Sequence, residues 1–518
     1  MSDHNSHSKN YGLNPTSQKV FHLLKDTINV IDIFAGPGGL SEGFASYKGK
    51  VAFDIRLSVE KEFWACETLR RRKAQYLDEI VAANVLAPLI RSRTNTSLIE
   101  KLPSALAKDV SARVCQATLG DEESNLEVRT RLRKLKLNDR TVLIGGPPCQ
   151  AYSAAGKSRN KGNLDYDPLK DHRNFLYREY LRMLVLTKPA VFVMENVKGL
   201  LSTKINGHPI FESILNDLQQ PQDYINGLTG PKYRIYSLVA AEDRDSGLLG
   251  NFDLRPIDYL VKAEEFGIPQ ARHRIILLGI REDLKTIPKT LEPSLQITTQ
   301  DALDDLPHLR AGTTGVWFDD HDHSRLLSQY ATDLFIRAIE LGHKTLASYL
   351  ESILEPENFT KKPYVPPGEG FQRTGFYNHE SRNHMPSDLK RYLFVSAFTK
   401  VNGISPKGPE GLNPYHLAPQ HKNWNSGKFA DRFRCQSAIK PSTTITSHSG
   451  KDGHYFIHYD PLQCRSLTVR EAARLQTFPD TYIFEGPISR QYQQVGNAVP
   501  VKLAQQIAGI VSAILTSG

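Results

Sequence analysis

Three short apolar runs, each stopped by an unusual group of glycine, proline or polar residues, constrain the fold of this chain most strongly. The runs at 28–34, 142–144 and 191–194 lead into Ala-Gly-Pro-Gly-Gly, Gly-Gly-Pro-Pro-Cys-Gln and Glu-Asn-Val, respectively. Such runs predict buried parallel strands, and helix-like segments between them, such as 175–186, predict an α/β, doubly wound sheet. In these sheets, functional residues collect beyond the carboxyl ends of the strands. We therefore expect the three groups to converge on one site.

The rest of the chain divides into segments of different texture. The run 274–279 predicts a further strand, whereas 468–478 and 501–515 predict helices. Between 281 and 455, prolines, glycines and histidines are frequent and only 324–353 shows weak periodicity, which predicts a second, irregular domain. The expected organisation is a flexible N-terminal arm at 1–27, a main domain at 28–280, a second domain at 281–455, and a C-terminal segment at 456–518 that returns to the main domain.

Composition excludes several classes of protein. The 518 residues include 5 cysteines without a CxxC pair, which argues against a disulfide framework and a zinc ribbon. No apolar stretch approaches the roughly 20 residues of a membrane-spanning helix, and the polar N-terminus lacks the apolar core of a signal peptide, so we expect a cytoplasmic protein without a membrane partner. The formal net charge of +9 suits a polyanionic partner but by itself favours nucleic acid only mildly.

The glycine turn 35–39 would let the backbone approach a ligand closely, and the following helix would offer free amide groups and its positive end. Its spacing departs from the GxGxxG of dinucleotide-binding folds, and a tight turn without a ligand explains it equally well. About twenty residues later, Glu60 falls where a second strand would end, and a carboxylate there can accept hydrogen bonds from both hydroxyls of a ribose. The alternative for Glu60 is a solvated surface acid.

Cys149 follows two prolines that fix the local backbone and two glycines that leave room for a substrate. Rigidity of this kind positions a nucleophile. Structural cysteines usually lie inside apolar runs rather than after Pro-Pro, so Cys149 is predicted to be the reactive thiol. The remaining thiols are predicted to be buried spectators: Cys66, Cys115, Cys435 and Cys464.

Six motifs in a fixed order resemble the DNA cytosine-C5 methyltransferases. They are Phe-Ala-Gly-Pro-Gly-Gly from Phe34, Pro-Cys-Gln around Cys149 with Tyr152-Ser153, Glu-Asn-Val from Glu195, Gln-Ala-Arg-His-Arg from Gln270, Arg-Glu-Ala-Ala-Arg-Leu-Gln-Thr-Phe-Pro from Arg470, and Gly-Asn-Ala-Val-Pro from Gly496. The likeness covers most of the chain outside 281–440. It implies a Rossmann-like, S-adenosylmethionine-dependent catalytic domain at 28–280, a target-recognition domain at 281–455, and a restriction-modification enzyme of the bacterial type.

The resemblance also assigns residues to the cofactor, S-adenosyl-L-methionine. The last helix and the segment after Gly496 are expected to pack beside the glycine turn and complete the pocket. The assigned cofactor-binding residues are Phe34, Ala35, Gly36, Gly38, Gly39, Glu60, Pro148, Asn497 and Val499. Two positions depart from the family pattern: Lys61 stands where an apolar or aromatic residue usually packs on adenine, and the acid near the adenine amine has no clear counterpart, Asp121 being poorly spaced for it.

The chemistry implied by the resemblance begins with addition of the Cys149 thiolate to C6 of cytosine, which makes C5 nucleophilic enough to take a methyl group. Protonated Glu195 would donate to N3, and a buried environment would keep it protonated. Arg272 and Arg274 would share one face of a strand, where a guanidinium bonds to O2 or to a phosphate, Arg274 being the preferred base contact. A phosphate clamp or a structural ion pair remains open for this arginine pair.

The implied partner is double-stranded DNA, from which the target cytosine must be flipped out. Candidates for reading bases in the second domain are Arg373, Arg382, Lys422, Arg432 and Arg434. His379 and His384 have no further ligands at convincing spacing, so we expect solvated loop histidines and no metal. A companion restriction endonuclease is expected as a functional partner, and a monomer suffices for every step.

Two other functions remain open. Relatives with the same motifs modify RNA cytosines, although those proteins lack a large variable domain. A DNA-binding regulator could keep the fold without turnover, but intact Cys149, Glu195 and both arginines disfavour it. A nicotinamide-dependent oxidoreductase would require GxGxxG and no Pro-Pro-Cys-Gln loop, and is excluded on both counts.

Overall fold

The computed structural model describes residues 26–81, 98–148, 176–205, 208–224, 229–240, 254–313, 320–360, 363–365, 369–421, 423–426 and 432–517. Of the predicted arm 1–27, only the last two residues belong to this set. Cys149 and Lys422 lie outside the described residues.

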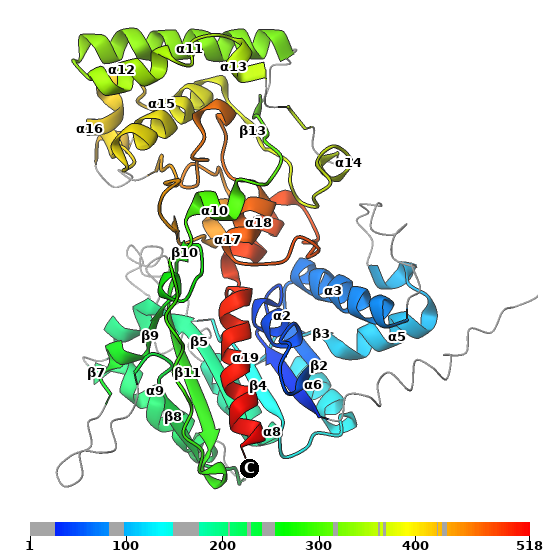
Figure 1. The fold of residues 1–518 in the computed structure, drawn as a ribbon. Coiled ribbons are helices and arrows are strands. Elements are labelled where there is room, and N and C mark those ends of the chain that lie inside the picture. The colour runs from blue at the N-terminus through cyan, green and yellow to red at the C-terminus, as the bar shows by residue number, and fades with distance from the viewer. Residues whose placement is uncertain are drawn as a thin grey trace, which may run out of the picture.

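One mixed sheet forms the lower part of the molecule (Figure 1). Its strands run in the order β3(Val114–Gln116), β2(Ala52–Glu60), β1(Thr27–Ile33), β4(Val142–Gly145), β5(Val191–Val197), β11(His273–Arg281) and β8(Tyr233–Tyr236), and β9(Leu260–Lys262) also pairs with β11. Strands β1 to β5 are parallel, and β11 is antiparallel to its three neighbours. The four strands predicted from apolar runs are therefore confirmed as β1, β4, β5 and β11.

Helices cover both faces of the sheet. One face packs against α2(Gly39–Ala45) and α19(Val501–Thr516), and the other against α6(Glu122–Lys134), α8(Leu176–Thr187) and α9(Ile210–Gln219). Alternate residues of each strand serve the two cores: Val142 and Ile144 enter the first, Leu143 the second. Helices α3(Phe63–Val81) and α5(Ser104–Arg113) lie beside β2 and β3. The doubly wound fold is confirmed.

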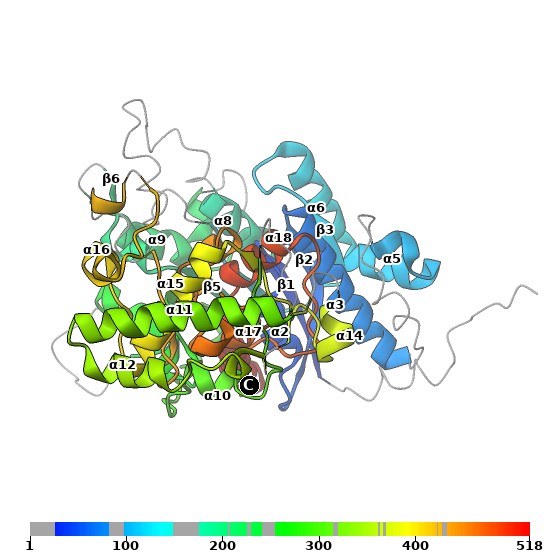
Figure 2. The ribbon, with the colours of Figure 1, turned by 90° about the horizontal axis from the view of Figure 1, so that it is seen from above.

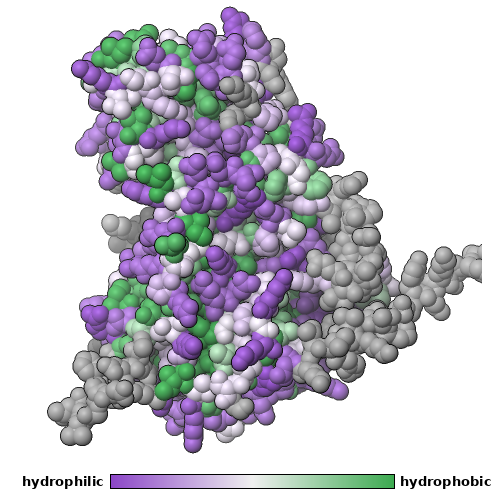
Figure 3. Space-filling model, viewed as in Figure 1, coloured by the Kyte–Doolittle hydropathy of each residue, from purple (hydrophilic) through white to green (hydrophobic). Residues whose placement is uncertain are grey.

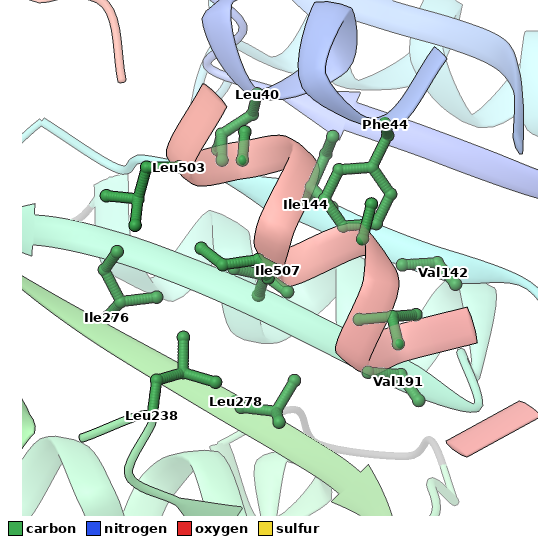
Figure 4. Close-up of a cluster of buried hydrophobic side chains, with 14 of the residues drawn as sticks. Leu40, Phe44, Val142, Ile144, Val191, Leu238, Ile276, Leu278, Leu503 and Ile507 are labelled. Atoms are coloured by element: carbon green, nitrogen blue, oxygen red, sulfur yellow. The ribbon is translucent and has the colours of Figure 1, made fainter. Parts of the chain in front are cut away.

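The final helix is a core element. Within Ile488–Thr516, an 18-residue window is apolar enough to cross a membrane, but 61% of that window is buried inside the protein. Figure 4 shows Leu503 and Ile507 of α19 lying between Leu40 and Phe44 of α2 and the strand residues beneath them. The apolar character of α19 is therefore explained by its two-sided burial against α2 and the sheet.

The upper lobe is more helical than the sequence predicted. Its helices are α11(Asp320–Glu340), α12(Lys344–Glu351), α13(Glu357–Thr360), α14(Gly370–Thr374), α15(Pro386–Asn402) and α16(Gly408–Leu412). Helix α15 is buried on most sides, and every residue of its run 393–397 is buried. A helix buried in this way has no polar face, so its sequence carries no 3.6-residue period. Two-residue strands β12(Gly312–Thr313) and β13(Asn383–His384) pair beside these helices.

A middle layer, here called the waist, joins the lobes (Figures 1 and 2). It consists of α10(Thr299–Leu303), α17(Val469–Leu475), α18(Ile488–Asn497) and the paired strands β10(Gln270–Ala271) and β14(Ser442–Thr443). Its own apolar cluster joins Leu303 and Ile445 with Phe478 and Val495. The waist thus draws on both sides of the expected boundary at 455. Strands β6(Lys204–Ile205) and β7(His208–Pro209) pair antiparallel as a separate two-stranded sheet.

The face of the molecule seen in Figure 3 is mainly hydrophilic, and its hydrophobic residues form small separate patches. Patches of this size are ordinary on a protein surface. The described part of this face therefore presents no large apolar docking area.

Candidate active site at the carboxyl edge of the sheet

The glycine turn after β1 leaves room for a ligand to approach its backbone closely. Gly36 has φ +56, and a Cβ placed there would meet nothing within 4 Å, whereas Gly38 has φ +92 and begins α2. Phe34 also adopts a positive φ of 54, which is uncommon for a bulky residue and marks a strained turn. The backbone of Gly36 therefore faces open space, as a ligand-binding turn requires.

Glu60 ends β2, as the sequence predicted, and its carboxylate organises the turn. Its two oxygens accept hydrogen bonds from the backbone amides of Gly36 and Glu62, each at 2.8 Å. Burial raises the pKa of Glu60, and the two amides act against that rise. Each carboxylate oxygen can accept a second hydrogen bond, so the group remains suited to ribose hydroxyls.

Asp32, one residue before the end of β1, is a buried acid near Ser41 and Glu60 that the sequence reasoning did not single out. Its side chain is 0% exposed, and neither carboxylate oxygen has a hydrogen-bond partner among the described residues. Burial raises its pKa to about 8, an effect that the nearby Ser41 hydroxyl opposes and the charge of Glu60 reinforces. A buried carboxyl with only the Ser41 hydroxyl beside it is costly to ionise, so Asp32 is a candidate for contact with a cationic or hydrogen-bond-donating ligand. The available signal was a single acid within the apolar run 28–34.

The C-terminal segment closes the turn from one side. A Cβ on Gly39 would lie 2.2 Å from the carbonyl oxygen of Val499, so this close approach requires glycine. The Tyr482 hydroxyl also donates to the carbonyl oxygen of Pro37. Asn497, the last residue of α18, is exposed. Residues 497–499 and the glycine turn, far apart in sequence, therefore lie side by side.

The start of the Pro-Cys loop lies against the end of β5. A Cβ on Gly146 would be 2.9 Å from Glu195 Oε2, and the Asn196 side-chain amide donates to the Pro147 carbonyl oxygen at 3.4 Å. Pro148, half-buried, is the last described residue of this loop. The contact fixes where the chain leaves for Cys149, which itself lies outside the described residues.

Glu195 faces an arginine rather than an apolar wall. Its Oε1 lies 2.8 Å from Arg274 Nε, and both side chains are largely buried, at 13% and 16% exposure. Arg274 also donates to the carbonyl oxygen of His273 at 2.8 Å. The pair places a carboxyl and a guanidinium next to the loop that carries Cys149.

Arg272 lies elsewhere, because the premise that both arginines occupy one strand is wrong. The strand pairing is interrupted at Arg272, which lies between β10 and β11 and is 2% exposed. Its Nη1 donates to the carbonyl oxygen of Ile445 at 2.9 Å and its Nη2 to that of Gly496 at 3.2 Å. The guanidinium of Arg272 is thus directed into the waist.

Other predicted residues are engaged within the protein. Arg382 lies over the Tyr492 ring at 3.8 Å and donates to backbone carbonyls, and Arg432 pairs with Asp452 at 3.0 Å. Arg373 is 55% exposed and contacts Glu369. Asp121 caps α6 by accepting from the Ser124 amide at 2.9 Å, which gives it an ordinary helix-capping role.

The expectation of solvated histidines was wrong. His379 is 0% exposed and hydrogen-bonds Thr468 at 3.0 Å and the Pro307 carbonyl oxygen at 2.8 Å, while His384 is 5% exposed beside Tyr392. Composition concealed this burial because the segments that carry these histidines pack against the waist and against α15. Within the described ranges, no group of three His, Cys, Asp or Glu residues could hold a metal ion.

The four other cysteines are buried and free, as predicted. Burial raises the pKa of Cys66 to about 12, of Cys115 to about 11 and of Cys435 to about 12, and raises that of Cys464 further still. Thiols with raised pKa values are poor nucleophiles.

The sheet carries the glycine turn, the Glu60 carboxylate and the start of the proline loop on one edge, which is where open α/β sheets bind their ligands. The family model for C-5 cytosine-specific DNA methylases matches residues 115–229 and 257–512. The chain therefore belongs to that family and is a DNA (cytosine-5-)-methyltransferase, and membership implies methylation from S-adenosylmethionine.

Type II methyltransferases are among its relatives. M.Bpa9945I of Bacillus paralicheniformis is 31% identical over 514 residues, covering 94% of this chain and 99% of its own. M.DdeI of Desulfomicrobium norvegicum is 25% identical over 504 residues, covering 94% and 88%. Among solved structures, the Entamoeba histolytica methyltransferase EhMeth is 13% identical with a TM-score of 0.42, covering 95% of this chain and 98% of its own.

Proposed function

We propose that this enzyme methylates C5 of a cytosine flipped out of a specific double-stranded DNA sequence, and so protects host DNA from a companion restriction endonuclease. The observation that supports the proposal most directly is the register of three parallel strands, in which Ile33 pairs with Gly145 and Gly145 with Met194. The glycine turn, the start of the Pro-Cys loop and Glu195 consequently share one edge of the sheet.

The reaction would begin at Cys149. Its thiolate adds to C6 of the cytosine, which places electron density on C5. C5 then forms a bond to the methyl group as the bond between that methyl group and the donor's sulfur breaks, the electron pair leaving with the sulfur. Loss of the C5 proton to a base and departure of the Cys149 thiolate from C6 then restore the ring. The Pro147-Pro148 sequence, held by Asn196, would limit the positions that the thiol can occupy.

Glu195 and Arg274 would stabilise the charge that builds in the pyrimidine. We assign to Glu195 a proton donated to N3 and to Arg274 a hydrogen bond to O2. Their 2.8 Å contact supports a joint role, because a guanidinium with several N–H groups can hold the carboxyl group and a base oxygen together. On this assignment the two residues recognise the Watson–Crick edge of the flipped base.

The residues at the glycine turn fit S-adenosylmethionine. The open space over Gly36 and the Glu60 carboxylate offer an approach for the ligand's backbone and its hydroxyl groups, and the acid Asp32 is buried behind them near Glu60. Asn497 and Val499 would complete the pocket. When bound, S-adenosylmethionine supplies an electrophilic methyl group on its sulfonium.

The upper lobe and the waist are proposed to read DNA. Flipping a base costs a few kcal/mol, roughly, and protein contacts must offset it. The net charge of +9 and the exposed Arg373 favour a phosphate-lined partner. We propose that the enzyme works as a monomer in the bacterial cytoplasm or nucleoid, where its substrate is found.

Two other functions would share this site: methylation of RNA cytosines and DNA-binding regulation without turnover. The upper lobe favours DNA, because its helices and the waist supply a surface far larger than a flipped base alone requires. The paired Glu195 and Arg274 favour turnover, since a regulator has no use for them.

The test incubates the protein with radiolabelled S-adenosylmethionine and separate pools of unmethylated genomic DNA and tRNA, and identifies the product base by mass spectrometry. Cys149→Ala should make no product, and Cys464→Ala, which removes a buried thiol of the upper lobe, is the matched control. 5-Methylcytosine in DNA from the wild type and the control supports the proposal. Label in tRNA supports the RNA function, and tight DNA binding without transfer supports regulation.

A further inference from the structure

Gln270 and Arg272, here called the junction clamp, join three parts of the chain that meet in the waist. Gln270 is 0% exposed; its amide donates to the Leu475 carbonyl oxygen at 3.1 Å and its oxygen accepts from the Ile445 amide at 2.8 Å. Arg272 binds the carbonyl oxygens of Ile445 and Gly496. Both polar groups of Ile445 are thus held by the clamp.

The held segment, 442–447, descends from the upper lobe. Cys435 belongs to the upper apolar core, whereas Ile445 belongs to that of the waist. Strand β14 pairs in parallel with β10, and the Thr444 hydroxyl donates to the Ala271 carbonyl oxygen at 2.6 Å. The segment therefore links the upper lobe directly to the clamp.

The other side of the segment is closed by Gly496. A Cβ on Gly496 would lie 2.2 Å from the carbonyl carbon of Thr446, so the two backbones touch. The segment is held between 270–272 and Gly496, with the Arg272 guanidinium bridging the two sides. A displacement of the segment would have to move at least one of these neighbours.

Both neighbours of the segment, 270–272 and Gly496, are close in sequence to residues of the candidate site. Two residues beyond Arg272, Arg274 contacts Glu195, and the residue after Gly496 is Asn497. We propose that the junction clamp positions these residues for methyl transfer by holding segment 442–447 in a set place relative to Arg274 and Asn497. The proposal rests on the proposed function and assigns neither clamp side chain a contact with DNA or cofactor.

The cost of burying the Arg272 guanidinium indicates that this side chain positions its neighbours rather than stabilises the fold. Burial lowers the pKa of Arg272, the charge of Arg274 acts in the same direction, and Glu195 opposes both. Apolar side chains generally fill a buried junction at lower cost than a cation does. The planar fork of a guanidinium, however, can bind two carbonyl groups on different segments at once, which the compact ammonium of lysine cannot do in the same way.

The test compares Arg272→Lys and Gln270→Leu with Arg391→Lys. Arg391 is the matched control, because it is 8% exposed and donates to the carbonyl oxygens of Leu417 and Ala418 within the upper lobe. Both clamp variants should lower kcat on unmethylated DNA about tenfold or more while KM for DNA changes less than about threefold. The control should lose thermal stability but keep kcat.

A second readout requires no turnover. Calorimetry measures S-adenosylhomocysteine affinity with and without sheared genomic DNA, and the clamp variants should reduce the effect of DNA on that affinity. Clamp variants that lose only thermal stability would show a purely structural role, and a raised KM with unchanged kcat would show a DNA contact; either overturns the proposal. A wild type that never methylates DNA rejects the proposed function, whereas the calorimetric comparison still decides on the clamp.

Discussion

The carboxyl group of Asp32 provides a quantitative test of the cofactor site. It is fully buried, and its pKa is raised to about 8 from an ordinary value of 3.8. A carboxyl whose pKa is raised on folding contributes stability below its unfolded pKa, and this contribution is lost as pH rises towards the folded value. Asp32→Asn mimics the neutral acid and should remove this penalty.

The expected gain follows from the two pKa values. Because Asp32 ionises more readily in the unfolded chain than in the folded protein, it lowers the free energy of unfolding by about 2 kcal/mol at pH 5 and by about 5 kcal/mol at pH 7.5. Asp32→Asn should therefore stabilise the protein by about 3 kcal/mol more at pH 7.5 than at pH 5. Affinity for S-adenosylmethionine should fall about tenfold or more at pH 7.5, because a bound cation would favour the ionised form of Asp32, which Asn cannot adopt. The variant should therefore be more stable but bind less well.

Urea unfolding at pH 5 and pH 7.5, with calorimetric titration of S-adenosylmethionine, measures both effects. Asp54→Asn is a control of opposite sign: burial acts to raise the pKa of Asp54, but the charges of Lys73 and Arg113 lower it overall. That variant should destabilise at neutral pH. Equal stability of Asp32→Asn and wild type at both pH values, with unchanged ligand affinity, would refute the reasoning.

Three further outcomes are expected. Burial lowers the pKa of His379 to about 4, so its contribution to the free energy of unfolding is complete above pH 6.5 and declines as pH falls. Between pH 7 and pH 5, the free energy of unfolding measured in urea should therefore fall by about 2 kcal/mol less for His379→Gln than for the wild type. Glu195→Gln should lower kcat about 100-fold or more with DNA affinity retained by gel shift, and full activity would contradict its proton-donor role. Gly39→Ala should lower the melting temperature more than Gly36→Ala, because only Gly39 abuts the Val499 backbone; the reverse order would contradict this packing.

Much of the lower lobe was predictable because its signals are local. The apolar runs at 28–34, 142–144 and 191–194 became β1, β4 and β5, and the glycine turn and Glu60 appeared at the expected strand ends. A buried parallel strand is mainly apolar, and a turn with positive φ favours glycine whatever surrounds it. Such features need no information from distant residues.

The upper lobe was less predictable because distant packing decides it. Helix α15 is enclosed by its neighbours and has no polar face to reveal its period. His379 and His384 read as loop residues, yet His379 is buried against the waist and His384, in β13, is buried against α15. Exposure depends on what packs against a residue, which local sequence does not record.

By itself, the sequence determined the family, the α/β sheet, the glycine turn and the identity of the groups at the strand ends. Only the tertiary structure decided the partners of those groups. Arg272 and Arg274 are two residues apart, yet their partners are far apart in sequence. Arg274 contacts Glu195, whereas Arg272 binds the backbone carbonyls of Ile445 and Gly496. The physical reason is that side-chain direction follows from local backbone geometry, whereas the groups a side chain meets are brought there by the packing of the whole chain.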